Sequence, residues 1–342
     1  MEVTLKDIAA RIGVSNQVVS AVLNGKTNCR VSKEKRERIL ALARELKYQP
    51  NRLASGLRTG KSRIIGVLTD THAGYNRSYL LQEIERAARK RNYRILTSNT
   101  HDDLAGLAEN SRQLFNYGAA GMICLAHDYP EFRKEFAEVF TNDRRLVFLE
   151  KPAFPGVRSV SASRREGLIR LAADCKRLGI TRIGLIHSDP VSITERNLVS
   201  EYREAMELNG LSADPHLQVQ FSFRHSTIRE TCERILEEMI LPYRPELVYS
   251  EDAEHAIYLQ SRLTAMGWKV PEDILFYGGN NDPFFQYAAP PICSLKPRYE
   301  VIAEHLVSGA LDHTLYEEGV TVEAEYVPFE NPRMKRDNII KV

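Results

Sequence analysis

Two short amphipathic segments separated by a glycine begin this chain of 342 residues. In VTLKDIAARIGVSNQVVSAVLN, Thr4 is a typical N-cap for a first helix, whose apolar residues recur at helical spacing until Gly13 ends it. Ser15 is placed to cap a second helix. Two short helices joined by a glycine turn predict a helix-turn-helix, so this part of the chain is expected to fold as a small all-α domain.

Helical spacing divides the side chains of the second helix between two faces. Val18, Val19 and Val22 lie on one face. The other face carries polar and small residues: Asn16, Gln17, Ser20, Ala21 and Asn24. The second helix of such a motif enters the DNA major groove, where an Asn or Gln amide can donate to and accept from adenine at once. We therefore expect Asn16 and Gln17 to read bases.

A third helix is predicted from Ser32 through KEKRERILALARELKY, until Pro50 stops it. Residues 1–61 hold 13 Lys or Arg and 5 Asp or Glu, which gives 13 − 5 = +8. The whole chain is only +2, so the remainder carries 2 − 8 = −6. Positive charge gathered in one segment indicates contact with DNA phosphates. The alternative is that the charges on residues 33–38 form a solvated helix face.

The same segment, followed by YQPNRLASGLRTGKS, resembles the LacI/GalR family of bacterial transcriptional regulators. Members run close to VTLxDVAxxAGVSxxTVSRVLN and then YxPNxxARxLRxGxS. The resemblance implies a DNA-binding regulator, by family default a repressor, which binds a pseudo-palindromic operator as a homodimer and is gated by a small-molecule effector, most often a sugar. The capping residues Thr4, Ser15 and Ser32 are also assigned to the DNA-binding surface. Val18 and Ala21 replace the usual Thr and Arg, so the preferred operator is expected to differ from the common half-site.

Residues 1–49 are thus predicted to be the DNA-binding domain and residues 50–61 a hinge. Asn51–Leu57 provides only two helical turns and contains Gly56, so alone it should be largely unfolded. In the family this segment folds in the minor groove, with a leucine at the Leu57 position wedged between base pairs. Asn51, Ala54 and Leu57 are therefore assigned to DNA binding, and a plain flexible linker is the alternative.

From Arg63 onward, short β-rich runs alternate with amphipathic helices, which predicts parallel sheets with crossover helices. The phosphate-binding patterns GxGxxG and GxxxxGK[ST] do not follow these runs. AMGWKVPEDILFYGGNND and PPICSLKPRYEVIAEHLV also resemble family segments. The resemblance implies an α/β, two-lobed periplasmic-binding-protein-like domain over residues 62–342. We expect one lobe near residues 62–161 and 292–322, the other near 162–291 and 323–342, and a ligand site between them.

Ligand-binding residues are carried over from the family one position at a time. Arg196 matches an arginine that grips sugar hydroxyls, and Phe221 matches an aromatic residue that stacks on sugars. Glu251 and Asn280 depart from the usual Asn and Asp, and Ser163 and Arg164 stand where Asp and Asn are frequent. Tyr75 and Tyr79 are added as possible linings of the pocket. The departures suggest a sugar derivative, such as an acidic sugar, whereas a surface arginine and core aromatics are the alternatives.

Other classes of function are weaker fits to this sequence. Five scattered cysteines without CxxC spacing indicate neither a disulfide framework nor a metal site, and no cofactor is expected. No apolar run reaches membrane-spanning length and no export signal begins the chain, so a cytoplasmic location is expected rather than a solute-binding protein for transport. His187, Ser188 and Asp189 are adjacent in sequence, and adjacent residues seldom build a catalytic site, so an enzyme is not expected.

One alternative within the same class stays open: a DNA-binding regulator whose ligand pocket is degenerate and which is controlled by a protein partner or by no ligand. No heptad helix follows Asn331, so a dimer is expected rather than a tetramer.

Overall fold

The computed structural model describes residues 3–23, 25, 29, 31–48, 63–69, 75–100, 103–126, 133–140, 145–152, 156–188, 193–221, 227–312 and 319–329. The chain divides into two compact units, Met1–Ser62 and Arg63–Val342. Each unit has hydrophobic clusters of its own. Within the described part of the chain, no helix combines the length and the apolar character that crossing a membrane requires.

Three helices form the first unit: α1 (Leu5–Ile12), α2 (Asn16–Leu23) and α3 (Lys33–Glu45). Gly13 ends α1 with a φ of 73°, in the left-handed region that glycine adopts without strain. One buried residue pair from each helix builds the core: Ile8 and Ala9, Val19 and Val22, Ile39 and Ala43. The predicted helix-turn-helix and third helix are therefore present.

The end of α3 differs from the prediction. The pattern extends the helix to Tyr48, whereas the structure ends it at Glu45. Lys47 adopts a φ of 49°, and the Tyr48 amide donates to the Ala43 carbonyl at 2.8 Å. The backbone thus leaves the helix in a left-handed turn that satisfies a terminal carbonyl, so the helix stops before Pro50 acts on it.

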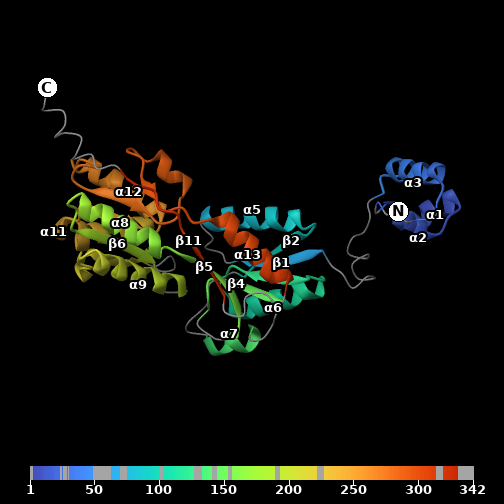
Figure 1. The fold of residues 1–342 in the computed structure, drawn as a ribbon, viewed down its shortest axis with the longest axis horizontal. Helices are drawn as coiled ribbons and strands as arrows, with labels where there is room; N and C mark the ends of the chain where they lie inside the picture. Colours follow the sequence, from blue (N-terminus) through green and yellow to red (C-terminus); the bar gives the residue numbers. More distant parts are fainter. Residues whose placement is uncertain are drawn as a thin grey trace, which may run out of the picture. The chain divides into compact units, whose positions relative to one another are not determined.

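The first lobe of the second unit contains a six-stranded parallel sheet in the order β11-β5-β4-β3-β1-β2. Its strands are β1 (Ile64–Thr69), β2 (Arg94–Asn99), β3 (Gly121–Cys124), β4 (Leu146–Leu149), β5 (Arg158–Ser163) and β11 (Val320–Glu323). Its helices are α5 (Tyr75–Lys90), α6 (Leu104–Asn116), α7 (Arg133–Phe140) and α13 (Tyr299–Leu311). Helices α5 and α13 cover one face of the sheet, and α6 and α7 cover the other (Figure 1).

The second lobe contains a five-stranded parallel sheet in the order β10-β9-β8-β6-β7. Its strands are β6 (Ile183–Ser188), β7 (Gln218–Phe221), β8 (Leu247–Ser250), β9 (Leu275–Gly278) and β10 (Cys293–Ser294). Its helices are α8 (Arg165–Arg177), α9 (Ile193–Leu208), α10 (Ile228–Ile235), α11 (Leu241–Tyr243) and α12 (Ala253–Ala265). Short turns complete it: η2 (Pro215–Leu217), the π-helical η3 (Leu236–Ile240) and η4 (Pro283–Tyr287). Helices α8 and α9 pack on one face of the sheet, while α10 and α12 pack on the other.

The chain passes between the lobes three times. It leaves the six-stranded sheet after Ser163, returns to it after Ser294, and leaves it again after Glu323. The expected boundaries at 161, 291 and 322 precede these strand ends by two, three and one residues. Because each lobe is built from separate stretches of sequence, residues far apart in the chain meet where the lobes join. The predicted architecture, a small all-α domain followed by a two-lobed α/β domain with parallel sheets, is confirmed.

Candidate functional site

The exposed face of α2 is the first candidate site. Val19 and Val22 are buried in the core of the first unit, and Val18 is partly buried. The opposite face is exposed or partly exposed at the predicted positions: Asn16, Gln17, Ser20 and Ala21. Since the buried valines fix the rotation of the helix, its amide side chains point away from the core, where a DNA base could meet them.

Hydroxyl side chains define the starts of the helices around this surface. The backbone amide and Oγ1 of Thr4 donate to Asp7 Oδ2 at 2.8 and 2.7 Å, and these bonds lower the pKa of Asp7. Ser15 Oγ accepts from a backbone amide three residues later at 3.4 Å. Ser32 Oγ does the same at 3.3 Å. All three hydroxyls therefore stabilise helix termini of the first unit.

Four residues assigned to DNA binding lie outside the described residues: Asn24, Asn51, Ala54 and Leu57. The hinge interpretation therefore stays a prediction.

The second candidate site is the lobe junction, formed by the starts of α5, α8 and α13 together with the ends of β6, β8 and β9. Arg164 directly precedes α8 and extends toward the ends of the second-lobe strands. Its Nε donates to the Gly279 carbonyl at 3.4 Å, and its Nη2 lies 3.6 Å from Glu251 Oε1. Only 12% of the Arg164 side chain and 15% of the Glu251 side chain are exposed. The pair therefore occupies the interior of the junction.

Glu251 also binds the end of β6. Its Oε2 accepts from the Ser188 amide at 3.3 Å and from Ser188 Oγ at 3.1 Å. Burial alone lowers the pKa of Arg164, but Glu251, Tyr249 and other acidic groups nearby raise it overall. Arg164 is thus a permanent positive charge in this interior.

Beside this pair, a second carboxylate holds the start of α8. Ser163 Oγ donates to Glu201 Oε1 at 2.8 Å, and the Arg164 amide donates to Glu201 Oε2 at 3.0 Å. Burial raises the pKa of Glu201, although these two hydrogen bonds act in the opposite direction. Both oxygens of Glu201 are consequently engaged by the backbone and side chain that lead into α8.

Aromatic rings from both lobes meet at the edge of the junction. Tyr75 and Tyr79 at the start of α5 are 43% and 37% exposed, so neither is a core residue. Their rings stack with centroids 6.3 Å apart. Tyr75 also meets Phe284 of the second lobe edge-on at 6.4 Å, and Tyr79 meets Tyr299 at 5.6 Å. The predicted tyrosines are therefore partly exposed and contact aromatic rings of the second lobe and of α13 at the edge of the junction.

Two other predicted ligand residues, Phe221 and Asn280, are buried. Phe221 is 2% exposed and packs in the second-lobe core, with its ring centroid 4.2 Å from that of His255, which favours the core alternative. Asn280 is 8% exposed, and its carbonyl accepts from the Tyr299 hydroxyl at 3.4 Å. Arg196 belongs to α9, but its side chain is outside the described part of the structure.

Sequence reasoning missed two residues of the junction, Arg77 and Tyr249. Tyr249 on β8 is fully buried, and a Cβ on the neighbouring Gly279 would lie 2.5 Å from its Oη. Within the described residues, Tyr249 Oη and Arg77 Nη1 are buried without a hydrogen-bond partner. No sequence signal singles them out, because Tyr249 belongs to an apolar strand and Arg77 is one of several charges on α5.

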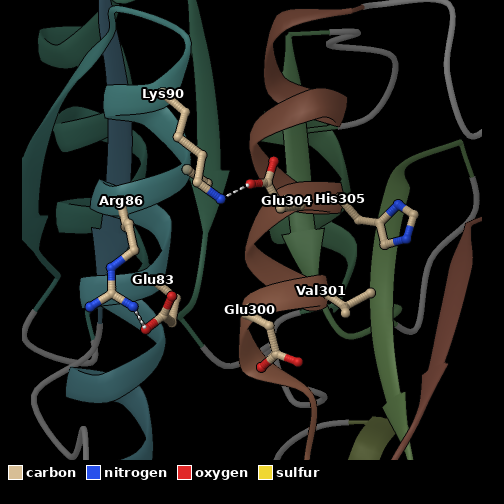
Figure 2. Close-up of a pocket in the computed structure, with 8 residues that line it drawn as sticks. Glu83, Arg86, Lys90, Glu300, Val301, Glu304 and His305 are labelled. Carbon is tan, nitrogen blue, oxygen red and sulfur yellow. Dashed lines mark hydrogen bonds and ion pairs between the residues drawn. The ribbon is translucent and has the colours of Figure 1, made fainter.

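A separate pocket of about 210 Å³ lies between α5 and α13. Figure 2 shows its ion pairs, Glu83 with Arg86 at 2.6 Å and Lys90 with Glu304 at 2.9 Å. The second pair links the two helices directly. These four charges pair with one another at the rim of a gap within the helix pair, whereas the lobe junction lies at the helix starts.

Comparison with known proteins matches a family model to each of the two units. Residues 4–51 match the model described as bacterial regulatory proteins, lacI family, and residues 172–330 match a periplasmic binding protein-like domain. The HTH-type transcriptional repressor PurR of Vibrio atlanticus (strain LGP32) is 24% identical over 313 residues, which cover 89% of this chain and 92% of that repressor.

Two solved structures share the fold. The Lac repressor dimer bound to operator and the anti-inducer ONPF is 21% identical, with a TM-score of 0.81 over 96% of this chain and 98% of that one. The complex of the transcriptional regulator CelR with cellobiose is 19% identical, with a TM-score of 0.66 over 96% and 99% of the two chains. The chain thus combines a lacI-family helix-turn-helix domain with a periplasmic-binding-protein-like domain, the domain composition of LacI/GalR-family bacterial transcriptional regulators.

Proposed function

We propose that this protein is a cytoplasmic repressor that binds a pseudo-palindromic operator as a homodimer and is gated by a small-molecule effector. One observation carries the proposal: α2 exposes Asn16 and Gln17 on the face opposite its buried valines, within a strongly basic unit. Amides on an exposed helix suit adenine recognition, and the surrounding Lys and Arg residues suit phosphate contact.

The lobe junction supports the effector part of the proposal. It places charged groups and exposed tyrosines between two lobes joined by three chain crossings. A ligand that contacts both lobes favours one arrangement of them, and binding is coupled to DNA affinity when that arrangement alters the hinge. The CelR structure contains cellobiose, which supports a sugar or sugar derivative as the effector here.

Dimerisation follows from the symmetry of the proposed target. Two copies of one DNA-binding domain read a pseudo-palindrome most simply when a two-fold axis relates them. The related Lac repressor structure is a dimer on its operator, which supports the same assembly here. Hydrodynamic measurement of the free protein, by analytical ultracentrifugation, tests it directly.

The function as a whole is tested by selection of purified full-length protein against randomised DNA duplexes, with and without a panel of sugars. We expect enrichment of a pseudo-palindrome, and a change in that enrichment with one class of ligand. A palindrome that is indifferent to every ligand would support the partner-controlled alternative. Failure to enrich any site would overturn the DNA-binding proposal.

A further inference from the structure

Arg164 has more hydrogen-bond donors than acceptors around it. A guanidinium carries five N–H donors and accepts no hydrogen bond. Among the described residues, Arg164 makes one side-chain hydrogen bond, from Nε to the Gly279 carbonyl at 3.4 Å. Its approach to Glu251 at 3.6 Å is an ion pair beyond normal hydrogen-bond length. The remaining N–H groups of this nearly buried side chain are therefore available to a ligand.

Arg77 and Tyr249 add two more donors to the same place. Within the described part of the chain, Arg77 Nη1 and Tyr249 Oη are both buried and lack a hydrogen-bond partner. A buried polar atom of this kind is costly unless something binds it. Arg77 comes from the first lobe and Tyr249 from the second, so a group that bound both would connect the lobes.

Tyr299 places Arg77 and Arg164 in the same electrostatic neighbourhood. Its hydroxyl donates to the Asn280 carbonyl at 3.4 Å, at the start of α13 where the chain re-enters the first lobe. Burial raises the pKa of Tyr299, while the positive charges of Arg164 and Arg77 both act to lower it. Both guanidiniums are therefore within electrostatic reach of one phenol.

Two of the carboxylates nearby have both oxygens engaged, and a third accepts a hydrogen bond through one oxygen. Glu251 uses Oε2 for two hydrogen bonds from Ser188, and Glu201 uses both oxygens at the start of α8. Glu150 Oε1 accepts from the Ala162 amide at 3.0 Å. These three acids outnumber the two guanidiniums, yet among the described residues none of them accepts a hydrogen bond from Arg77 Nη1 or Tyr249 Oη.

We infer that the lobe junction binds an anionic small molecule whose carboxylate or phosphate group is held jointly by Arg77 and Arg164, with the Tyr249 hydroxyl as a third donor. This inference rests on the proposed effector role and specifies the chemical class of that effector. A neutral sugar hydroxyl brings one donor with each acceptor, whereas a carboxylate or phosphate supplies acceptors only. Hydrogen bonds between an anionic group and a planar guanidinium are also stronger than hydrogen bonds between neutral groups.

The test compares matched neutral and anionic probes on the full-length protein by calorimetry at constant ionic strength. The probes are glucose against glucuronate, galactose against galacturonate, and then glucose 6-phosphate and inorganic phosphate. We expect one of the anionic probes to bind about tenfold or more tightly than its neutral counterpart, as charge-assisted hydrogen bonds require. The uronates and the phosphates distinguish the two sources of negative charge. Binding of a neutral sugar as tight as its acid, or binding of no anionic probe, overturns the inference.

Variants locate the site. Arg77→Met should abolish the preference for the anionic probe over its neutral counterpart. Tyr249→Phe keeps the ring packing and should weaken binding of the anionic probe several-fold. The matched control is Arg89→Met, on the same helix, where the side chain is 63% exposed and paired with Glu85. Equal effects of Arg77→Met and Arg89→Met contradict the inference.

Operator binding, measured on the same protein preparations, separates the two proposals. If the parent protein binds the operator but none of the anionic probes, only the inference about the ligand is refuted. Absence of any DNA site refutes the proposed function, and the calorimetric result still decides whether the junction binds anions.

Discussion

Arg164 Nη2 and Glu251 Oε1 lie 3.6 Å apart, with 12% and 15% of the two side chains exposed. The contact joins the residue before α8 to the residue after β8, so it links a chain crossing to the second-lobe sheet. Removing either partner leaves the other charge poorly solvated. We expect Arg164→Met and Glu251→Gln each to lower the free energy of unfolding by about 2 kcal/mol, less than for a fully buried pair.

A double-mutant cycle measured by urea denaturation checks this pair. The coupling between Arg164 and Glu251 should be about 1 kcal/mol, within the usual range for residues in direct contact. The exposed pair Arg89 and Glu85 on α5 is the control, and its coupling should be undetectable. Comparable coupling in the two pairs would show that burial adds nothing at the junction.

Asn16→Ala and Gln17→Ala should each weaken binding to the selected operator about five- to a hundredfold, because each amide is expected to contact a base edge. Fluorescence anisotropy at fixed salt, on the operator and on a scrambled duplex, measures the effect. Binding to the scrambled duplex should change little. Gln113→Ala, an exposed amide on α6, is the control. Equal losses on both duplexes would mean that the amides contact phosphates rather than bases.

Ile39 is fully buried in the small core of the first unit. Ile39→Ala should cost about 2–5 kcal/mol, enough to unfold a domain of this size. Hydrogen exchange should then show lost protection in α1, α2 and α3 with the two sheets unaffected, and DNA binding should disappear. Leu263→Ala, equally buried in the second lobe, is the matched control and should spare the first unit. Loss of protection throughout the chain in both variants would contradict two independent units.

Apolar sequence patterns were sufficient for most of the sheet strands but not for all of them. The apolar runs IIGVL and RIGLIH correspond to β1 and β6. Strand β5 shows no such run, because Arg158 and three serines interrupt its apolar pattern, although Arg158 and Ser159 are buried. The buried Arg158 guanidinium donates a hydrogen bond to the Gly309 carbonyl at 2.6 Å. Only the tertiary fold brings this acceptor to the arginine.

In the candidate sites, too, the sequence predicts local features but not those that depend on the tertiary fold. Local helix periodicity predicts the exposed face of α2, since neighbours on a helix face are close in sequence. The lobe junction brings together residues that are more than a hundred positions apart in sequence, such as Arg164 and Gly279. The sequence singles out Arg164 because it departs from a family pattern, whereas Arg77 and Tyr249 come together only through the chain crossings.

Glu201 provides a pH-dependent test of the start of α8. Burial raises its pKa above the ordinary glutamate value, so the folded protein holds this proton more tightly than the unfolded chain does. The stability contribution of Glu201 is therefore greatest below the ordinary glutamate pKa, and it is lost as pH rises through the raised value. Glu201→Gln cannot ionise, and its amide can still accept from the Arg164 backbone and donate to Ser163 Oγ. The variant should gain stability relative to the parent protein as pH rises from 4 toward 7, about the range of glutamate titration.

Urea denaturation of both proteins across this range measures the difference in free energy of unfolding. Glu109→Gln on α6 is the control, because hydrogen bonds from Gln113 and Arg112 lower the pKa of Glu109. Its difference should move in the opposite direction, since a lowered pKa stabilises the fold above the unfolded value. A Glu201→Gln difference that stays constant with pH would mean that Glu201 ionises equally easily in both states, and that its two hydrogen bonds offset its burial.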